Sequence, residues 1–303
     1  MTERWRRDLR VAIFTDDPGW HGRALQRALA AHAIETINVS LKDCAFALVI
    51  GAPTVLIPGF DGALPRACFV RGVPGGSLEE VVLRLDFLHA LELLDIAVFN
   101  TGRAIERTVD KAMTSFRLAL HGLATPATWV YEAAGTMPLE PAARLAAGQS
   151  LVAKPLFGSQ GEGVRRVDST AVGDAVGGVH YLQDYVARDG PPFRDVRVLV
   201  IAGRARYAME RVSLHWVTNR AQGARCLALK LTAEITALAE AASQAIDIDY
   251  AGVDLMQDHA GDWWIGEVNG IPAWWGLQQT TPDDITAALA EAFVAKIVAL
   301  ETH

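Results

Sequence analysis

The stretch Leu151–Val164, LVAKPLFGSQGEGV, combines residue types that could bind a nucleotide. Lys154 follows a short apolar run, and the next ten residues contain three glycines, a serine, a glutamine and a glutamate. Glycines let a backbone turn tightly and bring its N–H groups close to an anion. This order suggests a flap over phosphates, although an ordinary glycine-rich hairpin has the same composition. It is not a Walker A loop, because its lysine precedes the glycines.

Two later segments, Ala251–Gln257 and Trp263–Asn269, are predicted to be strands joined by a turn. Glu267 and Asn269 are two residues apart, so their side chains leave the same face of the strand. An antiparallel pairing could bring Asp254 alongside them. Two carboxylates and an amide oxygen are a donor set suited to Mg²⁺. The alternative is a polar strand edge in which nearby arginines or lysines offset the carboxylates.

A lysine near the middle of the chain has a similarly open role. Asp110 is expected to cap a helix that carries Lys111 in its first turn and ends before Gly122. A helix N-terminus favours anions, so a lysine there opposes the helix dipole. Lys111 is therefore either a solvated surface residue or a cation assembled beside a phosphate.

Alternating strands and helices precede that lysine and predict a small, open, mostly parallel sheet. Helices are expected over His21–His32 and Leu78–Leu94. Short apolar runs, read as strands, lie at Val11–Phe14, Ile34–Val39, Phe46–Ile50, Ala67–Val70 and Ile96–Phe99. Beyond the glycine stretch, strands are predicted at Tyr181–Val186, Arg194–Gly203 and Arg204–Val212, and helices at Leu231–Ile246 and Asp283–Leu300.

The composition limits the classes of protein and of partner. The chain has 303 residues, of which 51% are apolar and 21% charged, so it can bury a large core. Its formal charge of −7 argues against a general nucleic-acid binder. No apolar run approaches the length of a membrane span. Three scattered cysteines fit reduced thiols better than a disulfide framework, and we expect a cytoplasmic protein.

Taken in order, these segments resemble the ATP-grasp superfamily, and more closely its RimK-like branch of amino-acid and glutamate ligases. The resemblance covers Ala67–Leu300 and is carried by NTGRAIERTVDKAMT, VAKPLFGSQGEGV, YLQDYV, RDVRVLVIAG and AGVDLM…EVN. It implies an α/β fold with α+β lobes, namely an ATP-grasp fold after an open α/β domain. The implied domains are a pre-ATP-grasp domain over residues 1–99, a small lobe with the flap over 100–181, and a C-terminal lobe with the metal site over 182–303.

The resemblance also implies roles for the matching residues. Lys111 and Lys154 are similar to two lysines that neutralise ATP phosphates from opposite lobes. Asp195 is similar to an acid that binds ribose, and Thr218 and Asn219 match a segment near the nucleotide. The implied flap comprises Ser159, Gln160, Gly161, Glu162 and Gly163. The implied hinge, which reads adenine, comprises Gln183, Asp184 and Tyr185. The implied ligands of two Mg²⁺ ions, with Mn²⁺ as the alternative metal, are Asp254, Glu267 and Asn269.

In such enzymes a carboxylate attacks the γ-phosphate to form an acylphosphate, and an amine then displaces phosphate to form an amide. Charge neutralisation by lysines and metal fits this chemistry, and a flap would protect the acylphosphate from water. Arg197 and Arg211 are predicted on one sheet, as stabilisers of the transferred phosphate or as clamps on a carboxylate. Surface salt bridges are the alternative for both.

Two departures from the family bear on the substrate. The segment after EVN reads GIPAWWGL, in which Trp274 and Trp275 could form a stacking platform, a core contact or an oligomer contact. The segment WVTNRAQGAR lacks the basic double-glycine form of members that modify ribosomal proteins. We therefore expect a small-molecule carboxylate acceptor and an amino acid such as glutamate. A protein or carrier-protein acceptor, and a nucleotide-binding regulator without ligase activity, are the alternatives, and a homo-oligomer is left open.

Overall fold

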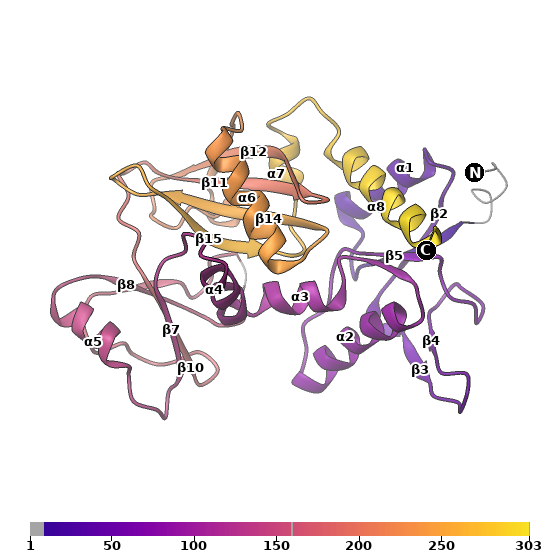
Figure 1. The fold of residues 1–303 in the computed structure, drawn as a ribbon, viewed down its shortest axis with the longest axis horizontal. Coiled ribbons are helices and arrows are strands. Elements are labelled where there is room, and N and C mark those ends of the chain that lie inside the picture. Colours follow the sequence, from indigo (N-terminus) through magenta and orange to yellow (C-terminus); the bar gives the residue numbers. More distant parts are fainter. Residues whose placement is uncertain (1–8, 159, 303) are drawn as a thin grey trace. The chain divides into compact units, whose positions relative to one another are not determined.

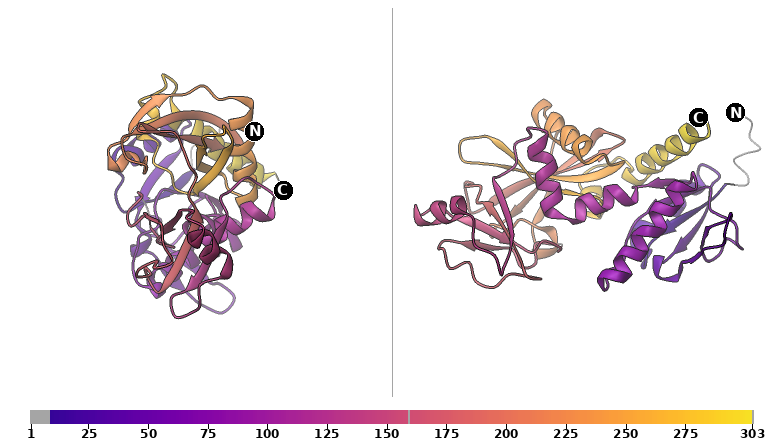
Figure 2. Two further views of the ribbon diagram at one scale, coloured as in Figure 1. Left: turned by 90° about the vertical axis from the view of Figure 1, so that its left-hand side faces the viewer. Right: turned by 60° about the horizontal axis from the view of Figure 1, so that its bottom comes forward.

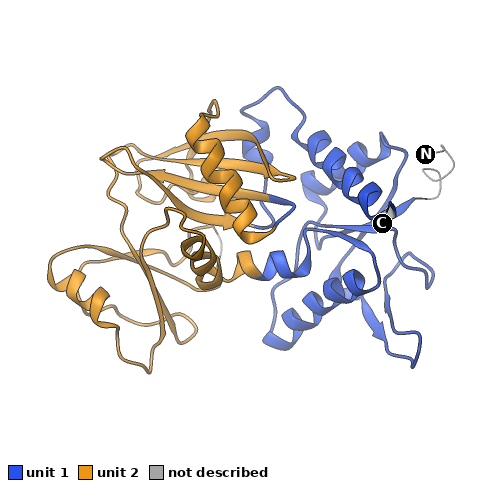
Figure 3. Ribbon diagram, viewed as in Figure 1, with its two compact units in different colours: residues 1–106, 248–250, 270–303 blue, residues 107–247, 251–269 orange. Residues whose placement is uncertain are grey.

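The computed structural model describes residues 9–158 and 160–302, which form two compact units. Unit 1 comprises residues 1–106, 248–250 and 270–303, and unit 2 comprises residues 107–247 and 251–269 (Figure 3). Residues 270–303, assigned from the sequence to the third lobe, thus group with the N-terminal residues. The finer division into three lobes stays a prediction.

Unit 1 is built on a four-stranded sheet with the order β2-β1-β5-β6 (Figure 1). All three pairings are parallel, so the predicted open parallel sheet is confirmed. The crossover helices are α1 (Gly19–Ala30) and α2 (Leu78–Leu93). The strands are β1 (Arg10–Phe14), β2 (Glu35–Val39), β5 (Ala67–Val70) and β6 (Ala97–Phe99).

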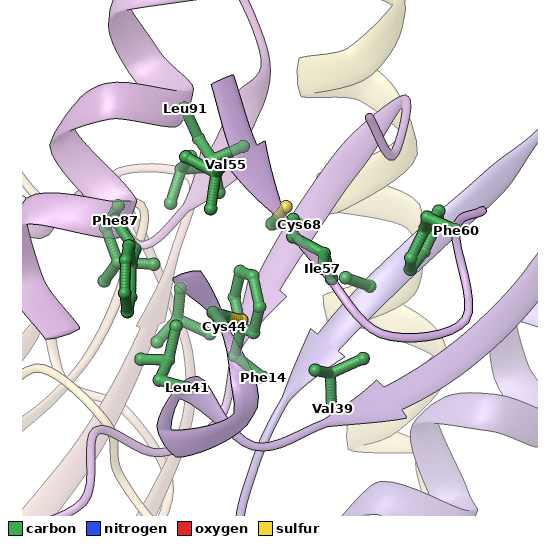
Figure 4. Close-up of a cluster of buried hydrophobic side chains, with 14 of the residues drawn as sticks. Phe14, Val39, Leu41, Cys44, Val55, Ile57, Phe60, Cys68, Phe87 and Leu91 are labelled. Atoms are coloured by element: carbon green, nitrogen blue, oxygen red, sulfur yellow. The ribbon is translucent and has the colours of Figure 1, made fainter. Parts of the chain in front are cut away.

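Helices cover both faces of this sheet, and its central strands are therefore continuously apolar. Phe14 and Cys68 pack with Phe87 of α2 in one buried cluster (Figure 4). On the other face, Phe69 lies 5.5 Å, centroid to centroid, from Phe293 of the C-terminal helix α8 (Ile285–Glu301). The last helix of the chain thus packs against its N-terminal part (Figure 2).

One predicted strand of unit 1 is wrong in extent. The apolar run Phe46–Ile50 predicts a strand to its end, whereas β3 spans Ala45–Ala47 and pairs with β4 (Thr54–Leu56). Leu48, Val49 and Ile50 are exposed. The chain turns here, and Gly51 has a φ of +80°, a backbone conformation that ends the pairing. A short 3₁₀ helix, η2 (Leu41–Asp43), precedes β3.

The first sheet of unit 2 has four strands in the order β7-β10-β8-β9, and its neighbouring strands are antiparallel. Leu145 of helix α5 (Leu139–Ala146) packs in a small core with Leu151 and Leu182. The strands are β7 (Thr128–Glu132), β8 (Leu151–Lys154), β9 (Arg165–Val167) and β10 (Val179–Asp184).

The second sheet of unit 2 has five strands in the order β13-β12-β11-β14-β15. β11 and β12, which the sequence predicts as two successive strands, form a hairpin around Ala202 and Gly203, and both turn residues have positive φ. Helix α6 (Ala233–Ile246) packs on this sheet, and the short η3 (Arg220–Gln222) precedes β13. The strands are β11 (Phe193–Ile201), β12 (Arg204–Ser213), β13 (Arg225–Ala228), β14 (Tyr250–Gln257) and β15 (Trp263–Asn269).

The helix around Lys111 forms as the sequence predicts. Helix α4 (Lys111–Leu120) follows α3 (Gly102–Val109), and Asp110 caps it by accepting hydrogen bonds from the N–H groups of Ala112 and Met113. Gly122, with a φ of +68°, follows its end. No helix in the described part of the chain is long and apolar enough to cross a membrane.

Within unit 1, Asn100 joins segments that are distant in the sequence. Its buried amide donates to the carbonyls of Tyr250 (2.8 Å) and Gly270 (2.5 Å) and accepts from the N–H of Tyr250 (2.9 Å). These bonds attach the C-terminal segment and its helices, α7 (Trp275–Gln278) and α8, to the carboxyl edge of the parallel sheet.

We predict that Asn100→Ala lowers the free energy of unfolding of unit 1 by about 2–4 kcal/mol, because it leaves buried backbone groups without partners. Urea denaturation followed by tryptophan fluorescence measures the change. Asn38→Ala is the matched control in the same unit, since the Asn38 Oδ1 is buried without a hydrogen-bond partner and little is lost with it. Equal losses for both variants would contradict this role of Asn100.

Candidate nucleotide site

A cleft in unit 2 gathers most of the residues that the sequence singled out. It is partly open to solvent, and residues from several segments of unit 2 line it. Its walls come from α4, the glycine loop, the end of β10 and one face of the five-stranded sheet. The predicted residues that line it are Lys111, Lys154, Gln160, Gly161, Glu162, Gln183, Asp184, Tyr185, Asp195, Arg211, Thr218, Asn219, Asp254 and Glu267.

Four predicted residues stand apart from that set. Gly163 belongs to the glycine loop without lining the cleft, and Arg197 and Asn269 lie on strands β11 and β15 without lining it. Ser159 lies outside the described residues.

Lys154 ends strand β8, and its ammonium donates to the side-chain carbonyl of Gln183 on the neighbouring strand, at 2.7 Å. Burial lowers the pKa of Lys154, and the nearby Glu267 acts in the opposite direction. The Gln183 amide in turn donates to Thr128 Oγ1 at 3.0 Å and to Tyr181 Oη at 3.3 Å. Gln183 therefore orients Lys154. The family resemblance implied only that Gln183 belongs to the adenine hinge, and it did not predict this role.

Lys111 reaches the same cleft from the first turn of α4. Its Nζ donates to the carbonyl of Gly158 at 2.7 Å and lies 3.9 Å from an Oε of Glu267. It is not a solvated surface lysine, because its side chain is only 12% exposed. Lys111 and Lys154 therefore line the same cleft.

The glycine loop has the backbone that its composition requires. Gln160, Gly161 and Gly163 have φ values of +61°, +75° and +69°. A Cβ at Gly163 would lie 2.8 Å from Pro155, and one at Gly161 would lie 2.8 Å from the Gln222 amide nitrogen. Gln222 also donates to the Gln160 carbonyl at 3.0 Å. This segment is the loop of the β8–β9 hairpin, and its residues Gln160 and Gly161 line the cleft.

A buried network of ion pairs forms the floor of the cleft. Arg211 donates to both carboxylate oxygens of Asp195, at 2.7 and 2.6 Å, and its Nη2 lies 3.1 Å from Asp254. Arg197 binds Asp254 through two further hydrogen bonds. Burial alone would raise the pKa of Asp254, but the two arginines hold it below its ordinary value. Neither arginine is a surface salt bridge.

Asp195 has little capacity left for a ribose. Its carboxylate is buried, and besides Arg211 it accepts a hydrogen bond of 2.5 Å from the Thr218 hydroxyl. The neighbouring Asn219 accepts from the N–H of Ala221 and so caps η3. In this structure Thr218 donates to Asp195, and Asp195 in turn accepts both hydrogen bonds from Arg211.

The predicted oxygen donors pair as the strand pattern requires. β14 and β15 are antiparallel, with Asp254 opposite Glu267 and Gly252 opposite Asn269. The Asn269 amide nitrogen donates to the Gly252 carbonyl at 3.2 Å, so its Oδ1 is the atom suited to a cation. No group of three or more His, Cys, Asp or Glu side chains in residues 9–158 and 160–302 could hold a metal ion by itself. Mg²⁺ is usually bound by a few protein oxygens, and phosphates and water complete its coordination.

The segment after β10 has its main-chain donors engaged within unit 2. The N–H groups of Asp184 and Tyr185 bond the carbonyls of Ala127 and Ser150. The Asp184 carboxylate lies 3.1 Å from Arg144, and the Tyr185 ring packs against Trp216. Asp184 and Tyr185 both line the cleft, and their role as an adenine hinge stays a prediction.

Sequence reasoning missed several side chains that line the cleft, among them Ser115, Tyr181 and Arg188. Ser115 bonds Tyr181 Oη at 2.8 Å, and Arg188 donates to the Trp216 carbonyl. Ser115 stands four residues after Lys111 and Tyr181 two before Gln183, so helix and strand periodicity could have placed both at the cleft. No local pattern marks Arg188.

The sequence left a stacking platform, a core contact and an oligomer contact open for Trp274, and the structure shows the core contact. Trp274 is 1% exposed, its Nε1 donates to Thr286 at 3.0 Å, and its ring packs against His21. It is a core residue of unit 1. Trp275 is 36% exposed and remains available for contact.

Comparisons with known proteins point in one direction. The family model described as a RimK-like ATP-grasp domain matches residues 109–293. The tetrahydromethanopterin:alpha-L-glutamate ligase of Methanococcus maripaludis is 32% identical over 237 residues, covering 75% of this chain and 78% of the relative. The alpha-aminoadipate--LysW ligase LysX of Saccharolobus solfataricus is 29% identical over 194 residues, covering 60% and 68%.

A solved structure shows the same fold. The ATP-grasp ligase PsnB, complexed with a minimal precursor, has a TM-score of 0.73 at 19% identity and covers 96% of this chain and 99% of its own. The same ligase is known in complex with precursor, Mg and ADP.

We predict that Gln183→Leu lowers kcat/KM for ATP about tenfold, because Lys154 loses a charge-assisted hydrogen bond and its orientation. Steady-state kinetics with varied ATP measure the loss. Gln149→Leu, at an exposed position of unit 2, is the control and should behave as the wild type. A Gln183→Leu enzyme with unchanged kcat/KM would show that Lys154 needs no such partner.

Proposed function

Because this chain belongs to the RimK-like ATP-grasp family and is an ATP-dependent carboxylate–amine ligase, we propose that it adds glutamate to the carboxylate of a small molecule. The predicted family and ATP-grasp fold are confirmed by the family match and by the structural likeness. The name of the relative from M. maripaludis, a tetrahydromethanopterin:alpha-L-glutamate ligase, supports glutamate as the amino acid and a small molecule as the acceptor.

The observation that carries the proposal is the convergence of Lys111 and Lys154 with Asp254 and Glu267 in one cleft. Their ammonium groups donate to the uncharged oxygens of the Gly158 carbonyl and the Gln183 amide, with the Glu267 carboxylate 3.9 Å from Lys111, and they offer positive charge to a triphosphate. We propose that they hold the β- and γ-phosphates, and that Arg211, fixed by Asp195, faces the transferred phosphoryl group. Charge stabilisation of this kind is the main protein contribution to phosphoryl transfer.

The proposed reaction has two steps. An oxygen of the acceptor carboxylate attacks the γ-phosphorus, the bond to the β-phosphate oxygen breaks, and ADP and an acylphosphate result. The neutral amino group of glutamate then attacks the acyl carbon, the acyl C–O bond breaks, and the products are phosphate, an amide and the amine's proton. The loop around Gly161 would cover the acylphosphate and limit its hydrolysis.

The donor set fits Mg²⁺, the metal that the family implies. Asp254 and Glu267 would hold it with the Asn269 Oδ1, and we propose two ions, with Mn²⁺ as the alternative. The metal would neutralise phosphate charge. Since Asp254 is already bound by Arg197 and Arg211, it would meet the metal as a firmly positioned carboxylate that stays ionised.

Adenine is proposed to lie beside Asp184, Tyr185 and Trp216, which line the cleft together. A protein acceptor is the second candidate, because the similar LysX is named as a ligase of LysW. The named relatives are ligases, which gives no support to a regulator without activity. A cytoplasmic location, the absence of a nucleic-acid partner and the oligomeric state stay predictions.

We predict that the chain, incubated with ATP, Mg²⁺, glutamate and a pool of small carboxylates, releases ADP and phosphate. Coupled assays for ADP and phosphate, with mass spectrometry of the pool, measure the products and the added glutamate mass. AMP and pyrophosphate would refute the acylphosphate mechanism. Added mass on a protein of a cell extract, and none on small molecules, would favour the protein acceptor.

Lys154→Ala and Glu267→Gln are each predicted to lower turnover by roughly 100-fold or more, because each removes charge that neutralises the phosphates or holds their metal. The circular dichroism spectrum should not change. Lys230→Ala, at an exposed position, is the control and should retain activity. Undiminished activity of Glu267→Gln would mean that the metal lies elsewhere.

A further inference from the structure

Thr128 begins strand β7 and is not among the residues that line the nucleotide cleft. It is nevertheless connected to Lys154 through one residue. Its Oγ1 accepts a hydrogen bond of 3.0 Å from Gln183 Nε2, and Gln183 Oε1 accepts one of 2.7 Å from the Lys154 ammonium. Gln183 lies opposite Thr128 on β10, and β8, which ends at Lys154, pairs with β10 on the other side. One sheet of unit 2 therefore holds all three side chains.

The hydroxyl proton of Thr128 has a fixed destination. A hydroxyl has one proton to donate, and Thr128 Oγ1 lies 2.8 Å from the carbonyl oxygen of Pro126, which can only accept. Toward Gln183 the same Oγ1 can therefore only accept. The nitrogen of the Gln183 amide must face Thr128, and the oxygen of that amide is turned toward Lys154.

Tyr181 also accepts from the Gln183 amide, but it does not decide the orientation. Its Oη lies 3.3 Å from Gln183 Nε2 and 2.8 Å from the Ser115 hydroxyl, and either hydroxyl of that pair can be the donor. The pair can therefore reverse its protons and match either orientation of the amide. Gln183 and Tyr181 are both 2% exposed, so protein groups must satisfy the amide.

An amide turned the other way would oppose Lys154. Its N–H groups would point at the ammonium, and two donors cannot bond each other. Its oxygen would face Thr128 Oγ1, whose proton is already used on the Pro126 carbonyl. Lys154 would lose a charge-assisted hydrogen bond, which is among the stronger kinds. Thr128 thus distinguishes the two orientations of Gln183, and only one of them holds the lysine.

We propose that Thr128 is a positioning residue of the ligase, which selects the Gln183 orientation that holds Lys154 for the phosphates of ATP. The proposal rests on the proposed function, in which Lys154 meets the β- and γ-phosphates. Thr128 acts through Gln183 and touches neither the nucleotide nor the reacting atoms.

The test compares Thr128→Val, which keeps the shape and removes the acceptor, with Thr128→Ser, which keeps the hydroxyl. Thr128→Val should lower kcat/KM for ATP about fivefold in the full chain, because it removes one buried hydrogen bond from Gln183. Thr128→Ser should stay close to the wild type. Thr170→Val, at an exposed position of unit 2, is the control and should behave as the wild type. Unchanged kcat/KM for Thr128→Val, or an equal loss for Thr128→Ser, would overturn the proposal.

A double-mutant cycle with Gln183→Leu separates positioning from a general weakening of unit 2. Because Thr128 acts through Gln183, Thr128→Val should cause less than about a twofold further loss of kcat/KM in the Gln183→Leu background. The same loss in both backgrounds would mean a merely structural role and would overturn the proposal. The Tm does not replace this readout, since Thr128→Val also deprives the Pro126 carbonyl of its donor in either background.

Nucleotide binding makes the test independent of ligation. In isothermal titration with AMP-PNP and Mg²⁺, Thr128→Val should weaken binding about fivefold and Thr128→Ser should not. If the wild type ligates nothing while AMP-PNP affinity follows Thr128 in this way, the proposed function falls and the positioning role stands. If ligation proceeds while neither kcat/KM nor AMP-PNP affinity depends on Thr128, the positioning role falls and the proposed function stands.

Discussion

Arg211 joins two carboxylates, Asp195 and Asp254, across the five-stranded sheet of unit 2, and the cleft depends on this arrangement. Each carboxylate alone would be costly to bury, and so would the arginine. Together with Arg197 they form an alternating row whose members are held by charge-assisted hydrogen bonds. Because such a row is stiff, the groups that would meet phosphate and metal are fixed before any ligand arrives, and little ordering remains for binding to supply.

Much of this was accessible from the sequence because it follows from local periodicity. The period of two along a strand placed Glu267 and Asn269 on one face, and the intervening turn forced the pairing with Asp254 that the structure shows. The Asp110 cap likewise followed from a preference within one helix turn. Family resemblance added the order of the segments and hence the ATP-grasp fold.

What the sequence could not predict depends on contacts between distant segments. The bond from Lys154 to Gln183 joins residues 29 apart, and nothing local shows whether a hinge residue uses its main chain or its side chain. The burial of Trp274 was equally hidden, since two adjacent tryptophans suit a platform and a core.

The hydrogen bond from Lys111 to the Gly158 carbonyl sets a condition on nucleotide binding. In the proposed function the same ammonium meets the triphosphate, so the first carbonyl of the glycine loop would compete with the nucleotide for Lys111. The strength of this competition depends on the effective concentration of the carbonyl at the ammonium group, which the length and stiffness of the loop determine. Under this proposal, the free energy of ATP binding would include the cost of displacing this carbonyl. A change in loop length would alter that affinity without touching any group that contacts the nucleotide.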